Sequence, residues 1–308
     1  MTTNTTPSLR DTAPKFSLGT DAVRRPDDCV SCGTKVFTPF CPNCGERRAS
    51  DRRHSLLEFF REHVVEAVIN ADGRIIRTLK ILLTKPGKAT VEFMRGARMP
   101  YLAPLQCFLI MNLAFFVWAT TVGDRFFDTQ LSVHVRGTPY AGVARRMVLA
   151  RLAADSEPEA AYARRFNTMG TAQAKSLVIT MIPAFALLVG VATVRRRNRA
   201  PVVQHLVFAL HTFCFLFVLI IVATYLIDLP LGFILSKVGW PEGQYGYDAE
   251  QSLVMLAVFC TYVGLALRRA YALGKIRSVV GAMVLGLGLY VILTAYRGLL
   301  FWVTFHSV

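Results

Sequence analysis

Four cysteines near the start of the chain have the spacing of metal ligands. Cys29 and Cys32 are separated by two residues, Cys41 and Cys44 repeat that spacing, and eight residues lie between the pairs. Two intervening residues let both thiolates of a pair reach one tetrahedral ion, and the glycine after each pair lets the backbone turn towards the sulfurs. The pattern predicts that residues 29–48 form a zinc ribbon.

Two other kinds of site use paired cysteines. Disulfides need an oxidising compartment, and a redox-active pair normally begins a helix within a βαβ unit. The segment shows neither a route to such a compartment nor that pattern, so zinc is the preferred interpretation. Because all four ligands are thiolates, no open position remains for catalysis, and the zinc is predicted to be structural. The remaining cysteines, Cys107, Cys214 and Cys260, lie in apolar runs and are interpreted as packing residues.

The body of the chain is apolar enough for a lipid bilayer. Hydrophobic residues make up 53% of the 308 residues. A spanning helix needs about 20 mainly apolar residues. Five segments meet this condition: 102–122, 176–194, 205–227, 249–267 and 278–305. The predicted fold is therefore an all-α integral membrane protein, with about five transmembrane helices in residues 102–305 and a small N-terminal zinc ribbon.

The flanking segments have their own patterns. Residues 1–28 are polar and lack an apolar signal-peptide core, so we expect a disordered tail. Residues 54–99 show apolar stripes of helical period beside cations, which predicts amphipathic helices in the membrane interface; the alternative is a cytosolic helical hairpin packed on the loops. Within 123–175 we expect two short amphipathic helices, the second capped by Ser156.

Charge predicts the orientation of the spans. The net charge is +15, and the connections RRRNRAPVVQ and RRAYALGKIR each carry four cations and no acid. The positive-inside rule then places the N-terminus in the cytoplasm and the C-terminus outside, with anionic lipid headgroups near the basic connections. The connection 123–175 disagrees, with eight Lys and Arg against five acids, but its length weakens the rule. Nucleic-acid binding is the less favoured interpretation because the cations lie in short clusters between apolar runs.

Several polar residues fall inside the predicted spans, where each is costly unless paired or hydrated. A polar cluster open to the cytoplasm is one interpretation, and helix–helix hydrogen bonding is the other. The candidates are Gln106, Asn112, His205, His211 and Tyr262. Asp228 and Arg297 lie at matching depths near the outer face, where they form either an ion pair or separate contacts with headgroups.

The order of these motifs resembles that of a bacterial membrane-protein family known only as a domain of unknown function. The resemblance rests on the zinc ribbon followed by RTLKILLTKPG, EFMRGARMPYLAPLQCFLIMN, HLVFALHTFCFLF and LRRAYALGK. It implies a bacterial source and an inner-membrane location, and it supplies no catalytic residues.

The sequence thus predicts a non-enzymatic inner-membrane protein whose cytosolic zinc ribbon docks a protein partner or has a regulatory role. The alternative is a small transporter or channel that uses the polar cluster around His211. A lipid-modifying enzyme ranks last because no nucleophile–base pair is visible.

Overall fold

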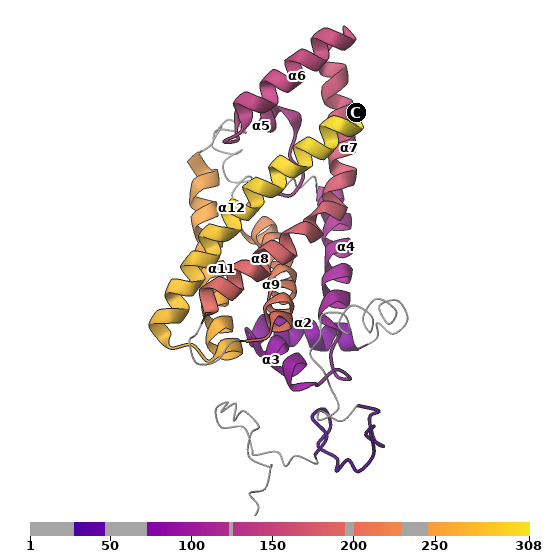
Figure 1. Ribbon diagram of the computed structural model, residues 1–308, viewed down its shortest axis with the longest axis vertical. Helices are drawn as coiled ribbons and strands as arrows, with labels where there is room; N and C mark the ends of the chain where they lie inside the picture. Colours follow the sequence, from indigo (N-terminus) through magenta and orange to yellow (C-terminus); the bar gives the residue numbers. More distant parts are fainter. Residues whose placement is uncertain (1–27, 47–72, 123–125, 195–199, 229–245) are drawn as a thin grey trace, which may run out of the picture.

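The computed structural model describes residues 28–46, 73–122, 126–194, 200–228 and 246–308 (Figure 1). Within these ranges the regular elements are helices, apart from isolated bridge residues in the cysteine segment, where Asp28 pairs with Lys35. The predicted tail 1–28, except for its last residue, and the first half of the predicted 54–99 helices lie outside the described residues. The helices are α2 Arg74–Thr84, α3 Lys88–Arg95, α4 Pro104–Val122, α5 Leu131–Arg136, α6 Ala141–Asp155, α7 Glu159–Leu177, the 3₁₀ turn η2 Val178–Thr180, α8 Met181–Thr193, α9 Val202–Ala223, the π-turn η3 Thr224–Asp228, α11 Gly246–Tyr271 and α12 Lys275–Ser307.

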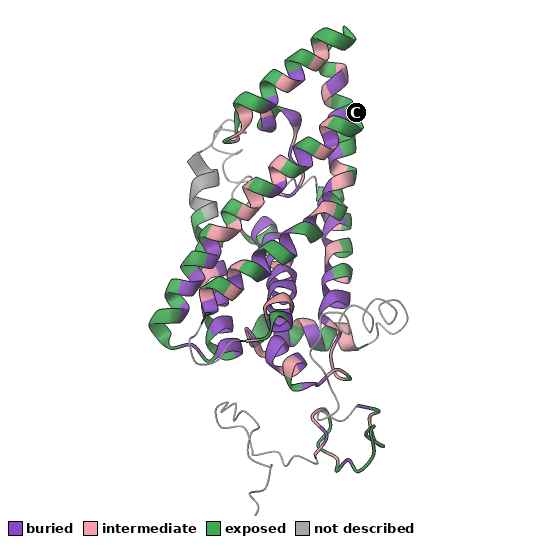
Figure 2. Cartoon of the chain, in the orientation of Figure 1, coloured by how far each residue is buried: buried purple, intermediate pink, exposed green. Residues whose placement is uncertain are grey.

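Five helices of the described chain are long and apolar enough to cross a membrane. They are Pro104–Val122, Glu159–Thr193, Val202–Ile227, Leu253–Tyr271 and Lys275–Ser307. The third is central: 72% of its most apolar stretch is buried, against 28–39% for the other four. Figure 2 shows this difference as the buried length of α9 beside the exposed outer face of α12. An outer face of exposed aliphatic side chains is expected where lipid tails, not water, are the solvent.

The helices alternate in direction between two ends of the molecule (Figure 1). α4, α9 and α12 start at the end that carries the four cysteines, and the α7–α8 run and α11 return to it. The C-terminus lies at the opposite end. The end of α8, the start of α9 and the α11–α12 connection therefore share one end with the cysteines, and α5 and α6 occupy the other.

The second apolar helix is longer than the predicted span. The run from Glu159 to Thr193 is continuous, so the second predicted amphipathic helix is the first half of this helix rather than a separate element. Its interior proline, Pro183, follows the η2 turn, where a tighter helix tolerates the missing N–H at position 183. The predicted cap at Ser156 is wrong. Ser156 ends α6 with φ 51°, and Pro158 precedes α7 without a side-chain cap.

A distal helical layer covers the end opposite the cysteines. α12 has 33 residues, about 50 Å of helix against about 30 Å of hydrocarbon, so one end must project from a bilayer. Its last turns pack with α5, α6 and the start of α7 around a second, smaller core. That core contains Leu131, Ala144, Val148, Tyr162, Phe166 and Phe301.

The α2–α3 hairpin is held against the first half of α9 and the last half of α11, which lie at the same end of the molecule. The Tyr262 hydroxyl donates to the carbonyl of Leu82 at 3.0 Å, and an Arg269 N–H donates to the carbonyl of Pro86 at 2.5 Å. Gly87 has φ +77°, and a Cβ added there would lie 2.6 Å from the backbone oxygen of Ala266. Only glycine satisfies both conditions at the hairpin turn. The hairpin is thus part of the packed body.

Candidate metal centre

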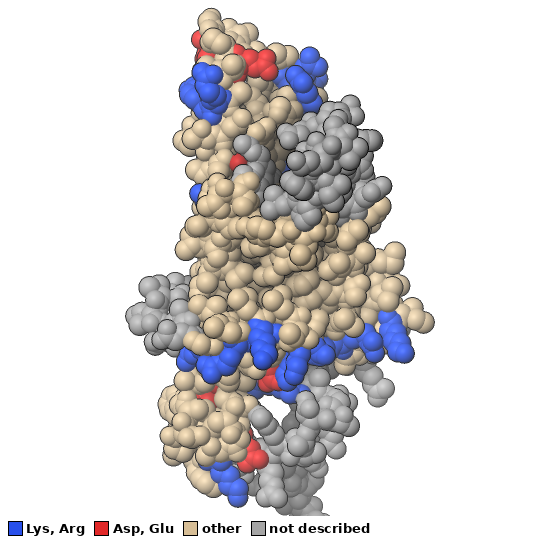
Figure 3. All heavy atoms as spheres, turned by 180° about the vertical axis from the view of Figure 1, so that it is seen from behind, with Lys and Arg blue, Asp and Glu red and all other residues tan. Residues whose placement is uncertain are grey.

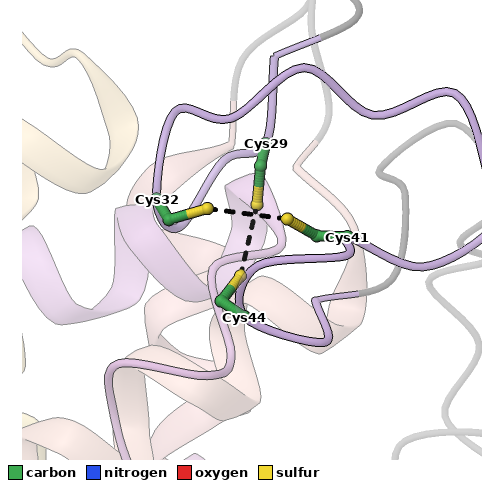
Figure 4. Close-up of side chains that lie close together, drawn as sticks. All are labelled: Cys29, Cys32, Cys41 and Cys44. Atoms are coloured by element: carbon green, nitrogen blue, oxygen red, sulfur yellow. Dashed lines mark hydrogen bonds between the residues drawn. The ribbon is translucent and has the colours of Figure 1, made fainter.

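The cysteine module, residues 28–46, contains two similar turns that face one another (Figure 4). In the first, the N–H of Gly33 donates to the carbonyl of Cys29 at 2.9 Å; in the second, the N–H of Gly45 donates to the carbonyl of Cys41 at 2.9 Å. Both glycines have positive φ, +76° and +73°. This left-handed conformation lets each chain reverse after its second cysteine. Each turn thereby presents two sulfurs to the same point.

The sulfur geometry fits one tetrahedral ion. The four Sγ atoms all lie within 4.8 Å of one another, with Cys29–Cys44 at 3.6 Å and Cys32–Cys41 at 3.5 Å. A tetrahedron with Zn–S bonds of about 2.3 Å has S–S edges of about 3.8 Å. The cysteines are free thiols, and no disulfide joins them. The four-cysteine cluster is therefore able to hold a metal ion, as the spacing predicted.

The electrostatics of the cluster also call for a cation. Hydrogen bonds with the hydroxyl and then the backbone of Thr34 lower the pKa of Cys32 to about 6, whereas burial raises the pKa of Cys44 to about 12. The buried thiol of Cys44 thus resists ionisation, because burial disfavours its thiolate form. A bound divalent cation removes this resistance by stabilising all four thiolates.

The module has almost no apolar core of its own. Val36, Cys29 and Cys41 are 3–4% exposed and form the buried cluster, with Cys44 packed beside them. Burying one valine stabilises a fold by about 1.5–3 kcal/mol, too little to order 19 residues, since each costs about 1–2 kcal/mol of backbone entropy. A metal ion held by the four thiolates would provide most of the remaining free energy.

A glutamate that the sequence analysis missed joins the module to the helical body. One carboxylate oxygen of Glu46 accepts the backbone N–H groups of Arg98 and Met99, at 2.8 and 2.9 Å, and the hydroxyl of Ser31 at 2.6 Å. Glu46 is 4% exposed, and its own carbonyl accepts the N–H of Cys41. The carboxylate therefore connects the second cysteine turn to the segment directly before α4.

Four of the five predicted intramembrane polar residues form a hydrogen bond with another helix. His211 Nδ1 shares a hydrogen bond with Thr90 Oγ1 of α3 at 3.0 Å, and His205 Nδ1 shares one with the Tyr271 hydroxyl of α11 at 3.0 Å. The amide of Asn112 donates to the carbonyl of Lys175 at 3.2 Å. Tyr262 bonds to Leu82 as described above, and Gln106 is buried at 6% exposure. These partners differ from residue to residue, an arrangement typical of contacts that fix helices to one another.

The predicted ion pair has one described member. Arg297 donates to the carbonyl of Phe126 at 3.5 Å, whereas the side chain of Asp228 lies outside the described residues. Arg297 thus contacts the segment between α4 and α5 within the described chain. The pair with Asp228 stays a prediction.

A buried histidine in the distal layer was not singled out from the sequence, where LSVHVR shows only a lone histidine among apolar residues. His134 is fully buried, its Nδ1 lies 2.8 Å from the Tyr140 hydroxyl, and its ring packs against Phe166 and Phe301. Burial, followed by the positive charge of Arg297, lowers the pKa of His134 to about 4. The folded distal layer therefore holds this imidazole neutral.

The low pKa predicts acid sensitivity of the distal layer. A histidine in the unfolded chain has a pKa near 6.5. Above that pH the neutral, buried His134 costs the folded protein nothing, and as the pH falls towards 4 the free energy of unfolding decreases because only the unfolded chain gains the proton. Between pH 6.5 and 5 the loss is about 2 kcal/mol. We expect the wild-type melting temperature to fall more steeply over this range than that of His134→Gln. His306→Gln, at an exposed position, should keep the wild-type slope, and equal slopes for all three proteins would contradict the assignment.

Comparison with known proteins matches one segment of the chain. Residues 72–116, which include α2, α3 and most of α4, match a family described as "Protein of unknown function (DUF3667)". No curated protein and no solved structure matches the chain. The matched segment contains the Pro86–Gly87 turn, Thr90 and the two backbone N–H groups that Glu46 contacts. These are the contacts that join the hairpin and the cysteine module to the rest of the protein.

Proposed function

We propose that this chain is a non-enzymatic, multi-pass protein of a bacterial inner membrane whose cysteine module is a zinc ribbon that docks a partner protein. The module would lie in the cytoplasm and the C-terminus outside. The basic ends of α11 and α12 support this orientation, because they share one end of the molecule with the module. A reducing cytoplasm also keeps thiolates available for zinc.

The Glu46 contact carries the proposal. A small module on a flexible tether could bind a partner without any consequence for the membrane helices. Here one carboxylate holds the module against Arg98 and Met99, in the connection between α3 and the first apolar helix. A partner bound to the module is thereby connected to α4 through rigid contacts, as a docking or regulatory role requires. The inter-helix hydrogen bonds of His211 and Tyr262 support a packing role for these residues, so we do not extend the proposal to transport.

Glu46→Ala is expected to separate the module from the body while leaving the metal in place. A hydrogen bond to a charged group contributes about 1.5–3 kcal/mol. Exchange of the Arg98 and Met99 amides with deuterium should therefore become roughly 10–100-fold faster, measured by hydrogen–deuterium exchange on the full chain. The zinc content should stay unchanged, because no ligand is altered.

The functional consequence is tested in the same preparation. Proteins that co-purify from native membranes with the wild type should be retained by Glu46→Ala, whose zinc ribbon is intact, and lost from Cys41→Ser/Cys44→Ser. Glu92→Ala is the matched control, since this acid of α3 pairs with Arg95 and not with the module. Unchanged exchange at residues 98 and 99 would contradict the rigid contact. An unchanged set of partners in the cysteine variant would contradict the docking role.

A further inference from the structure

Cations from two distant parts of the sequence form one band across the end of the helical body nearest the cysteine module. In Figure 3 the band crosses the molecule between the helices and the module, at the level of α2 and α3. Its described members, here called the basic collar, are Arg74, Arg77, Lys80, Lys85, Lys88, Arg268, Arg269, Lys275 and Arg277. All are exposed except Arg74 and Lys88, which are half-buried.

Tertiary contacts bring the two groups of cations together. The α2–α3 turn meets α11 where Gly87 lies against the backbone of Ala266, and Arg269 donates to the carbonyl of Pro86. The cations before and after this turn therefore lie beside those of the α11–α12 connection. The sequence assigned them to separate segments, and the structure makes them one surface.

Within the described residues the collar has almost no compensating negative charge. Between residues 73 and 104 and between 264 and 280, the sequence holds one acid, Glu92. Its carboxylate lies 3.7 Å from Arg95, which is outside the collar. None of the ion pairs found among the described residues involves a collar cation. Unneutralised cations at one level attract anions from outside the chain.

Exposed aliphatic side chains are interleaved with these cations. Ile276 is 80% exposed and stands between Lys275 and Arg277, while Ile76 is 73% exposed and precedes Arg77. Leu83 lies about two helical turns after Ile76 on the same face of α2 and is 42% exposed. A nucleic-acid backbone offers phosphates but no acyl chains for these aliphatic residues to contact. At the boundary between headgroups and acyl chains they face hydrocarbon, while neighbouring cations reach the phosphates.

We propose that the basic collar binds the phosphate groups of anionic phospholipids in the leaflet on the side of the cysteine module. The Lys and Arg side chains donate to phosphodiester oxygens, and the interleaved aliphatic residues contact the adjoining acyl chains. This inference rests on the membrane location in the proposed function. It adds a ligand class and a set of residues, and it does not depend on the partner of the zinc ribbon.

The test removes four collar charges whose side chains form no hydrogen bond or ion pair in the described chain. Arg77, Lys80, Lys275 and Arg277 are changed together to Gln in the full-length protein. The control changes Arg136, Arg145, Arg146 and Arg164 to Gln, which removes the same charge from exposed positions at the opposite end. Each protein is purified in detergent with phosphatidylglycerol and phosphatidylcholine in equal amounts, and the lipids retained are counted by native mass spectrometry.

The wild type and the control should retain phosphatidylglycerol in preference to phosphatidylcholine, and the collar variant should lose at least tenfold of this preference. Adding inorganic phosphate at the lipid concentration should not displace the retained lipid. Equal retention by the collar variant and the wild type, or displacement by phosphate alone, would overturn the proposal. Two further measurements on each variant test the proposed function separately. The zinc content reports on the metal site, and the activity in cells of alkaline phosphatase fused after Val308 reports on the orientation. Failure of the collar proposal is therefore distinguishable from failure of the proposed function.

Discussion

Cys41→Ser/Cys44→Ser is expected to lose its bound metal and to unfold residues 28–46. Serine is not a thiolate ligand, so one of the two cysteine turns loses both of its bonds to the ion. Structural zinc contributes about 10–16 kcal/mol in small modules, far more than the buried cluster around Val36 can replace. Zinc measured by mass spectrometry should fall from about one ion per chain to background. Limited proteolysis should then cleave within the module.

Cys260→Ser is the control for this experiment. Cys260 lies outside the module, and its sulfur contacts the carbonyl of Ala282, which a serine hydroxyl can also reach. It should retain zinc and resist proteolysis like the wild type. If the double variant still carried one zinc per chain, the four sulfurs would not be its ligands. If it lost zinc but the module stayed protease-resistant, metal would not be what holds the module together.

Gly87→Ala is expected to displace the α2–α3 hairpin from α11. The added methyl group would lie 2.6 Å from the backbone oxygen and 2.9 Å from the Cα of Ala266, and a helix backbone does not move aside as a side-chain end does. The φ of +77° adds about 1–2 kcal/mol of strain for a non-glycine residue. Together with the clash, a loss of about 3 kcal/mol or more is expected, seen as a lower melting temperature in detergent. The hydrogen bonds of Tyr262 and Arg269 to the hairpin should weaken with it.

Substitutions at two further glycines distinguish the effect of backbone strain at Gly87 from the effect of the steric clash with Ala266. Gly45 has φ +73° with no atom within 4 Å of an added Cβ, so Gly45→Ala carries strain alone. Gly142 has open space and no positive φ, so Gly142→Ala should be neutral or slightly stabilising because it lies in α6. A melting temperature for Gly87→Ala equal to that of Gly142→Ala would show that the hairpin is not packed against Ala266.

The spacing and composition of neighbouring residues were enough to predict the parts of this protein that form locally. The spacing of Cys29, Cys32, Cys41 and Cys44 implied a common ligand point because two residues between thiols fix their reach. Long apolar runs implied helices of membrane length because burial in lipid demands internally bonded backbone. The described chain has both features. The length of the α7–α8 run was underestimated because the polar residues before position 176 do not look like part of a span, although the helix continues through them and through the η2 turn.

The contacts that assemble these parts depended on residues far apart in the chain. Glu46 reaches the N–H groups of Arg98 and Met99, 52 and 53 positions away, and backbone donors have no signature in a sequence. The same holds for the carbonyl of Leu82, which Tyr262 reaches across 180 positions.

By itself, then, the amino-acid sequence determined a set of apolar helices and a four-thiol metal site, since each needs only local spacing and composition. The tertiary structure alone decided that the cysteine module is attached to the connection between α3 and α4, that the α2–α3 hairpin packs against α11, and that nine scattered cations form one collar. The physical reason is that these features arise from close packing and from hydrogen bonds to backbone groups. Nearly every residue carries the same backbone groups, so the residue types do not show which of them will be bonded.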